Sequence, residues 1–190
     1  MYIVNATELI PELQKRWRTI SFAAIATDAE SLVGMSKNAV EIMHQNLTDE
    51  HSFSLSWPRY IVPAMSPGED LDRMSRKAIE LIVKDLAKVK SSGAGVTTGL
   101  WQWTTGVMDS STCEAVWGPG NPYRDPEVFQ ACKTFEAGFL TLSCASFSQI
   151  RLPHFERARE VLAAAVTDYI CRGGLEHASG LVRKRFEHHR

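Results

Sequence analysis

A dense group of turn-forming residues interrupts the chain between Gly118 and Glu127, where the sequence reads GPGNPYRDPE. Glycine adopts the backbone conformations that end helices, and proline cannot continue a helix. Asp125 followed by Pro126 is typical of a helix start, because the carboxylate accepts hydrogen bonds from free backbone N–H groups and proline gives up no needed donor. We therefore expect one helix to end near Gly118 and another to begin at about Pro126.

Apolar residues on both sides of this segment recur at spacings of three and four, which predicts amphipathic helices. The clearest stripe consists of Leu71, Met74, Ala78, Ile82, Leu86 and Val89. Further helices are expected over residues 100–117, from Pro126 to about 145, over 153–170 before Gly173-Gly174, and from Leu175 to the C-terminus. With a helix near Ile10 and an amphipathic segment at 32–47, the total is about seven helices.

Other segments carry weaker signals. Tyr2-Ile3-Val4 predicts a short β-strand, and Pro11 means that the following helix either begins near Ile10 or has a distorted first turn. Prolines and Pro67-Gly68 make residues 48–68 a loop-rich region with at most one short helix. The predicted fold is mainly α with a short N-terminal strand, in a single domain over residues 1–190.

Charge and hydropathy argue against nucleic-acid binding and against a membrane-spanning segment. The chain has 21 basic and 22 acidic side chains, a net charge of -1, so it lacks the basic excess of a dedicated nucleic-acid-binding protein. Its longest uncharged stretch, residues 91–108, is rich in Gly, Ser and Thr, and no transmembrane segment is expected. The chain as given is expected to be soluble and cytoplasmic.

No catalytic or metal-binding constellation emerges from the isolated residues. The four cysteines form no C-x-x-C pair, have no histidine pair at zinc spacing, and are expected to be reduced, buried thiols. Three histidines, His177, His188 and His189, lie at the ends of the last predicted helices and could act as acids or bases. Solvated surface positions are the favoured interpretation for all three. Trp101 and Trp103 could stack a ligand, but core packing is favoured.

Continuous segments of the sequence are more informative than single residues. The segment Ser66 to Met74 (SPGEDLDRM) and the segment Gly118 to Glu127, followed by FEAGF at 135–139, resemble the N-terminal half of fungal cytochromes P-450. The branch that they resemble is related to prostacyclin synthase and the sterol hydroxylases. Arg157 to Glu160 (RARE) and Gly173 to Glu176 (GGLE) extend the resemblance over nearly the whole chain. It implies a partial P-450 fold, from helix B to about helix H.

The resemblance also implies a chemistry. Members of this family are haem-thiolate monooxygenases that oxidise lipophilic small molecules with O2 and receive electrons from an NADPH-dependent reductase. Full-length eukaryotic relatives are usually anchored to the endoplasmic reticulum membrane. The family's haem-binding loop, F-x-x-G-x-x-x-C-x-G, has no counterpart here, so the chain is expected to stop before the iron ligand. Two interpretations stay open: a P-450 fragment that is inactive alone, and a degenerate helical protein that serves as a binding or scaffold module.

One residue has an implied role toward haem. In the family, a Trp and an Arg four positions apart on helix C reach a haem propionate. Trp57 and Arg59 lie near this place but only two positions apart. Arg59 is therefore the expected cofactor-binding residue, and no catalytic residue and no metal ligand is expected in the chain.

Overall fold

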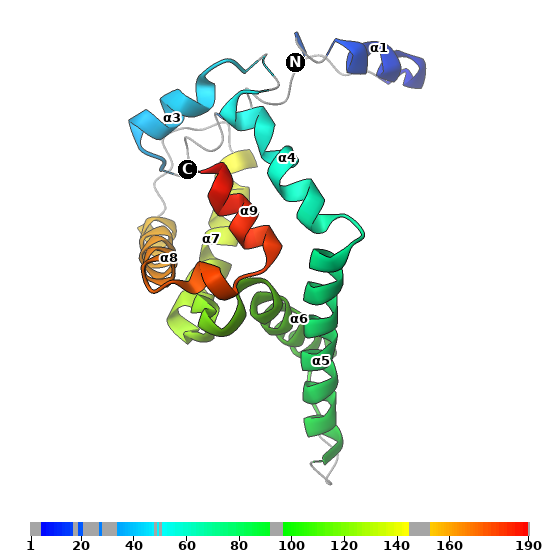
Figure 1. The fold of residues 1–190 in the computed structure, drawn as a ribbon, viewed down its shortest axis with the longest axis vertical. Coiled ribbons are helices and arrows are strands. Elements are labelled where there is room, and N and C mark those ends of the chain that lie inside the picture. The colour runs from blue at the N-terminus through cyan, green and yellow to red at the C-terminus, as the bar shows by residue number, and fades with distance from the viewer. Residues whose placement is uncertain are drawn as a thin grey trace. The chain divides into compact units, whose positions relative to one another are not determined.

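The computed structural model describes residues 5–16, 19–20, 27, 34–47, 49, 51–91, 97–144 and 153–189 (Figure 1). Eight α-helices and several 3-10 turns make up this part of the chain, and it contains no strand. The mainly α prediction is confirmed, while the strand predicted at Tyr2 to Val4 lies outside the described residues. Contacts divide the chain into two compact units, Met1–Pro58 with Leu140–Ile150 and Arg59–Phe139 with Arg151–Arg190. The single domain over 1–190 stays a prediction.

The described residues of the first unit include two short helices, α1 and α3. Helix α1 (Ile10–Lys15) follows a 3-10 turn and has Pro11 in its first turn, so the helix begins near Ile10. Helix α3 (Lys37–His44) begins where the Ser36 hydroxyl accepts a hydrogen bond from the N–H of Ala39 at 3.2 Å. A serine side chain at this position satisfies one of the donors that the first helical turn leaves free.

Helix α4 (Phe53–Met65) corrects the prediction of a loop-rich region with at most one short helix. It runs for 13 residues, with Pro58 and Pro63 inside it. Each proline removes a single backbone donor, and the carbonyl of Ser52 still accepts from the N–H groups of Leu55 and Ser56 at the start of the helix. Counting prolines as helix breakers therefore overstated their effect here.

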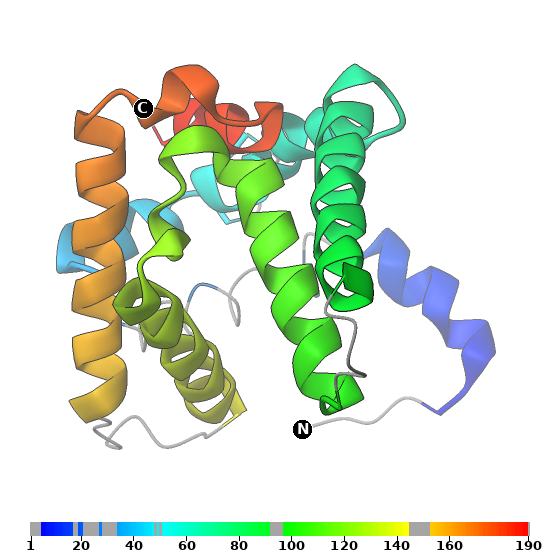
Figure 2. The same ribbon diagram turned by 90° about the horizontal axis from the view of Figure 1, so that it is seen from below.

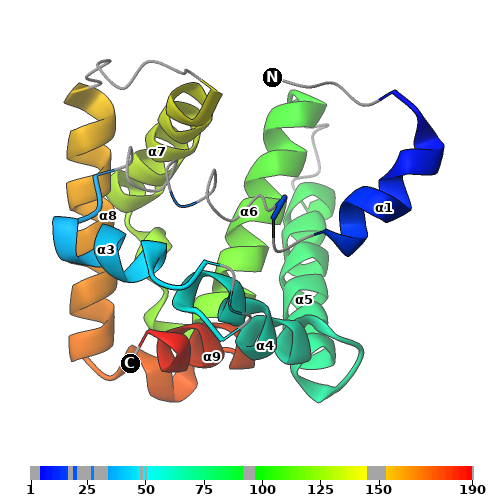
Figure 3. The same ribbon diagram turned by 90° about the horizontal axis from the view of Figure 1, so that it is seen from above.

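The second unit contains the long helices. Helix α5 (Glu69–Ser91) and helix α6 (Leu100–Trp117) lie side by side as an antiparallel hairpin (Figures 2 and 3). Helix α7 (Pro126–Cys144) and helix α8 (Pro153–Cys171) follow. These four helices confirm the predictions made for residues 71–89, 100–117, 126 onward and 153–170. None of the described helices combines the length and the apolar character that a bilayer span requires.

Aromatic rings connect α7 to α8. The rings of Phe135 and Phe155 stack with their centroids 4.7 Å apart. Gly138 lies one turn after Phe135, directly against the Phe155 ring, where any side chain would overlap the ring atoms. A pair of stacked aromatic rings with a glycine beside it lets two helices approach closely, so this glycine has a packing role.

The C-terminal helix is shorter than predicted. In place of one helix from Leu175 onward, the chain forms a 3-10 turn (Gly174–His177) and then helix α9 (Gly180–His188). Ser179 separates them, because its N–H donates to the carbonyl of Val116 at 3.0 Å and its hydroxyl caps α9 at the N–H of Val182. A long-range contact to α6 thus interrupts an apolar pattern that was continuous in the sequence.

Both ends of the Gly118 to Asp125 loop behave as the sequence predicts. Gly118 ends α6 with φ at 71°, a conformation that favours glycine. A Cβ at this position would also overlap the carbonyl of His177. Asp125 caps α7, because its Oδ1 accepts a hydrogen bond from the N–H of Glu127 at 2.8 Å. The capping prediction is confirmed.

Replacing Asp125 by Ala is expected to lower the free energy of unfolding by about 1 kcal/mol, because a first-turn donor of α7 loses its acceptor. Asp125→Asn and Asp125→Ser keep a side-chain acceptor and should retain most of the stability. Urea denaturation of the three variants checks this. Equal losses in all three variants would contradict the capping role.

Candidate functional site

The loop between α6 and α7 is rigidly hydrogen-bonded. It consists of two 3-10 turns, Gly118–Gly120 and Pro122–Arg124, joined by the buried Asn121. The Asn121 side chain accepts from the N–H of Tyr123 at 3.0 Å and donates to a carboxylate oxygen of Glu114 at 2.9 Å. One amide side chain thus ties the loop both to itself and to the last turns of α6.

Glu114 is the centre of this arrangement. Arg124 donates to both of its carboxylate oxygens at 2.6 Å, a bidentate geometry, and also donates to the carbonyl of Pro119 at 2.6 Å. Charge-assisted, bidentate pairs are among the stronger hydrogen bonds in proteins. The hydrogen bond from Arg124 lowers the pKa of Glu114, with help from Asn121, although partial burial opposes this. The same bond raises the pKa of Arg124.

Tyr169 closes the other side of the loop. Its hydroxyl lies 2.8 Å from the carbonyl oxygen of Trp117 and 2.7 Å from that of Gly174, so it can donate its proton to either. The buried ring of Tyr169 meets the Trp117 ring edge-on at 5.2 Å between centroids. A Cβ on Gly174 would overlap the tyrosine ring, so glycine is required there.

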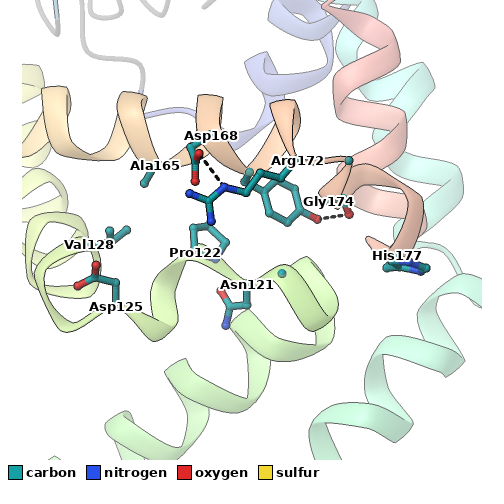
Figure 4. Close-up of a pocket in the computed structure, with 12 residues that line it drawn as sticks. Asn121, Pro122, Asp125, Val128, Ala165, Asp168, Arg172, Gly174 and His177 are labelled. Carbon is teal, nitrogen blue, oxygen red and sulfur yellow. Dashed lines mark hydrogen bonds and ion pairs between the residues drawn. The ribbon is translucent and has the colours of Figure 1, made fainter.

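A hollow of about 530 Å³ lies between this loop, α8 and the turn after it (Figure 4). Its polar lining includes Asp125, Asp168, Arg172 and His177. Asp168 and Arg172 form an ion pair at 2.8 Å, Asp125 is the cap of α7, and Figure 4 shows Asp125 and His177 at opposite ends of the group. The described lining therefore brings no nucleophile next to a base, and its groups hold helices and turns in place.

The cysteines differ in their surroundings. Cys113 on α6 and Cys132 on α7 are half-buried free thiols, and burial raises the pKa of each. Cys171 is exposed, which corrects the expectation of a buried thiol, because it is the last residue of α8. Near these thiols, burial raises the pKa of Tyr123 to about 12. Among the residues described, no three or more His, Cys, Asp or Glu side chains are grouped as a metal site would need.

Arg59 and Trp57 both lie on α4 and both are exposed. An α-helix turns by about 100° per residue, so side chains two residues apart project to nearly opposite sides of the helix. Trp57 and Arg59 therefore do not share a face. The structure therefore does not bring the two together as a pair. Contact of Arg59 with a haem propionate stays a prediction.

The remaining candidate residues are scattered. Trp101 is 77% exposed, so the expectation of core packing is wrong for it, whereas Trp103 is half-buried. His177 is exposed as expected, but the ring of His188 lies against Tyr60 in a tilted arrangement, with centroids 5.0 Å apart. The sequence analysis missed Glu114 and Tyr169. A signal for Glu114 existed, because it is one of only two charged residues between Leu100 and Trp117.

Glu114→Gln is expected to lower the free energy of unfolding by about 1 kcal/mol at neutral pH, a modest value because Arg124 is largely exposed. Since the folded state holds the pKa of Glu114 below 4.5, the ionised carboxylate stabilises the fold above that pH. This contribution is lost as the pH falls through the lowered pKa, so the difference between wild type and variant should shrink in acid. Urea titrations across acid and neutral pH measure it.

The matched control is Glu160→Gln, which removes an exposed carboxylate from α8. It should change stability little at either pH. If Glu114→Gln behaved like this control, the ion pair with Arg124 would not stabilise the loop.

Comparison with known proteins gives two fungal relatives. A cytochrome P-450 monooxygenase named nodJ from Hypoxylon pulicicidum is 25% identical over an alignment of 191 positions, which covers 98% of this chain and 35% of the relative. A cytochrome P-450 monooxygenase from Gibberella zeae is 23% identical over 119 residues, 62% of this chain and 23% of the relative. The chain thus spans about a third of the length of the first relative.

No family model matches the chain. No solved structure matches it either. The matched region in the Hypoxylon relative nevertheless covers almost every residue of the chain, the Gly118 to Glu127 loop among them. The chain is similar to fungal cytochrome P-450 monooxygenases.

Proposed function

We propose that this chain is the part of a cytochrome P-450 monooxygenase that runs from helix B to about helix H, from the branch related to prostacyclin synthase and the sterol hydroxylases. The observation that carries the proposal is the alignment of 98% of the chain with 35% of a fungal P-450. A chain of this kind contributes recognition surface and structural support. The iron ligand would come from another part of a protein of the relatives' length.

Cys113 and Cys132 do not fit the axial position of haem. A haem-thiolate enzyme uses an ionised sulfur, whereas burial raises the pKa of Cys113 and of Cys132. Both also lie in the middle of helices, Cys113 on α6 and Cys132 on α7. We therefore derive no chemical step through haem for this chain, and expect it to be inactive alone.

In the whole enzyme that we propose, bound haem would supply oxygen activation, a reductase would supply electrons from NADPH, and the substrate would be a lipophilic small molecule. In that setting α7 and α8, joined by Phe135 and Phe155, would form part of the roof over the substrate. The exposed guanidinium of Arg59 would donate to a haem propionate. Anchoring of the whole enzyme to the endoplasmic reticulum is part of the same proposal.

The second candidate is a non-catalytic binding or scaffold protein. Exposed apolar residues on α5 favour it, because Ile79 and Val83 are 59% and 58% exposed and lie one turn apart. A surface of this kind suits a partner helix.

A chimaera tests the proposed function directly. The aligned third of the Hypoxylon relative is replaced by this chain, and the absorbance of the reduced protein is measured under carbon monoxide. We expect haem incorporation with the spectrum of a thiolate-ligated iron, because the relative supplies its own cysteine loop. A folded chimaera without haem would contradict the proposal and favour a scaffold.

The same chimaera tests Arg59. Arg59→Ala should weaken haem retention, while Arg76→Ala, which removes another exposed guanidinium from the neighbouring helix α5, should leave it unchanged. The isolated chain serves as the negative control and is expected to bind no haem. A stoichiometric haem complex of the isolated chain that is lost when Cys113 or Cys132 is replaced by Ser would show that this chain does carry an iron ligand.

The isolated chain should also bind a hydrophobic dye or self-associate, because exposed apolar patches favour association. Ile79→Ser combined with Val83→Ser should reduce the dye fluorescence. Lys84→Ser on the same helix removes no apolar area and is the matched control. A sharply melting monomer that binds no dye would count against a fragment of a larger fold.

A further inference from the structure

Helix α5 carries a row of charges of alternating sign on its exposed side. Asp72, Arg76, Glu80 and Lys84 follow one another at intervals of four residues, and all four side chains are exposed. Residues four apart on an α-helix lie one turn apart on the same side, so the four form a continuous row. We call these four residues the charge row. Its signs alternate, from negative at Asp72 to positive at Lys84.

Apolar side chains lie beside the charge row. Ile79 and Val83 are 59% and 58% exposed. They line an open hollow of about 620 Å³ together with Ser75 and with Asp72, Arg76 and Glu80 of the charge row. Because these residues line one hollow, charged and apolar side chains belong to one continuous surface. We call the charge row with Ser75, Ile79 and Val83 the α5 surface.

The α5 surface lies across the helix from the side that packs within the second unit. Met74 is buried, and Ala78 and Leu81 are half-buried. Each of these three residues is two positions from residues of the α5 surface, and side chains two positions apart project to nearly opposite sides of an α-helix. Packing of α5 within its own unit therefore leaves the α5 surface open.

The charge row is not neutralised along its own helix. Alternating charges four residues apart commonly form ion pairs with each other on a solvated helix face. Here Glu80 instead lies 3.7 Å from Lys77, which is outside the row. Within the described part of the chain, Asp72, Arg76 and Lys84 form no ion pair. Three of the four charges are thus available to groups outside the chain.

The order of the signs makes the charge row complementary to itself. The midpoint of the row is residue 78, and reversing the row about this point exchanges Asp72 with Lys84 and Arg76 with Glu80. Each exchange replaces a charge by the opposite charge. A two-fold symmetric dimer presents the same patch from both copies, so it requires a patch that is complementary to its own reverse. Parallel rows in register would instead place like charges together.

We propose that two copies of this chain associate through their α5 surfaces as an antiparallel, two-fold symmetric pair. Asp72 of each copy pairs with Lys84 of the other, and Arg76 of each copy pairs with Glu80 of the other. The association needs neither haem nor an iron ligand. It is therefore independent of the proposed monooxygenase.

The packing of two α5 helices suits this arrangement. Rows of residues four apart interdigitate in the commonest class of helix–helix contact. Ile79 and Val83 then bury apolar area against the aliphatic parts of Arg76 and Lys84 of the second copy. One helix face is smaller than a standard interface, which buries about 1,600 Å² in total, so the dimer is weak and reversible.

Sedimentation equilibrium of the full chain tests the proposal. We expect a reversible dimer whose association weakens as salt is added, because salt screens exposed ion pairs. Arg76→Glu and Glu80→Arg should each weaken self-association at least about tenfold, since either change turns two ion pairs of the dimer into pairs of like charge.

A mixture of the two variants gives the sharper test. Arg76→Glu and Glu80→Arg should associate with each other, because the negative charges at positions 76 and 80 of one variant then face the positive charges at positions 80 and 76 of the other. A chain that carries both changes should again associate with itself. Attraction that depended only on exposed apolar area would restore neither.

The matched control is Arg157→Glu, which makes the same change of charge at an exposed position of α8. This variant should associate as the wild type does. A wild type that stays monomeric at a concentration of about 1 mM would overturn the proposal. So would an equal loss in the control, single variants that associate as the wild type does, or a mixture of the two variants that stays monomeric.

Discussion

The structure around the Gly118 to Asp125 loop depends on the placement of one carboxylate. Glu114 sits near the end of α6, and its two oxygens receive Arg124 and Asn121 from the loop that follows. This arrangement holds the chain in the turns that lead to the Asp125 cap, so it sets where α7 begins relative to α6 within the second unit. Tyr169 then joins the same loop to α8 through the carbonyl of Trp117. Three helices thus meet at a loop whose backbone groups bond to the side chains of Asn121, Arg124 and Tyr169, which makes the loop a structural support.

Local chemistry was sufficient to predict most helix boundaries in the second unit. Gly118, Asp125 and Pro153 each act on the backbone of their own turn, through a positive φ, a side-chain acceptor or a fixed proline ring. These effects are independent of tertiary structure, so the sequence reveals them. The two wrong predictions have non-local or cumulative causes. Ser179 breaks the last helix because it bonds to Val116, and α4 persists through its prolines because the remaining hydrogen bonds suffice.

The candidate site was harder to predict, for a physical reason. An acid on a helix can be paired or solvated, and the sequence does not say which distant cation faces it. Yet the helix from Leu100 to Trp117 has only Asp109 and Glu114 as charged residues, and both pair outside the helix. Asp109 contacts Lys133 of α7 at 2.7 Å, and Glu114 contacts Arg124. An acid in a helix that otherwise lacks charge is costly to bury unless it is paired, so isolated acids of this kind predict a tertiary ion pair.

The hairpin of α5 and α6 exposes apolar side chains in two places whose surroundings differ. Beside Ile79 and Val83 the sequence alternates in charge, with Arg76 and Glu80 close by. Charges of both signs beside exposed apolar side chains are typical of a surface that packs against protein. Leu100 and Trp101 instead lie in an uncharged stretch, residues 91–108. Apolar exposure is thus common to both places, and the charge pattern beside each is the property that distinguishes them.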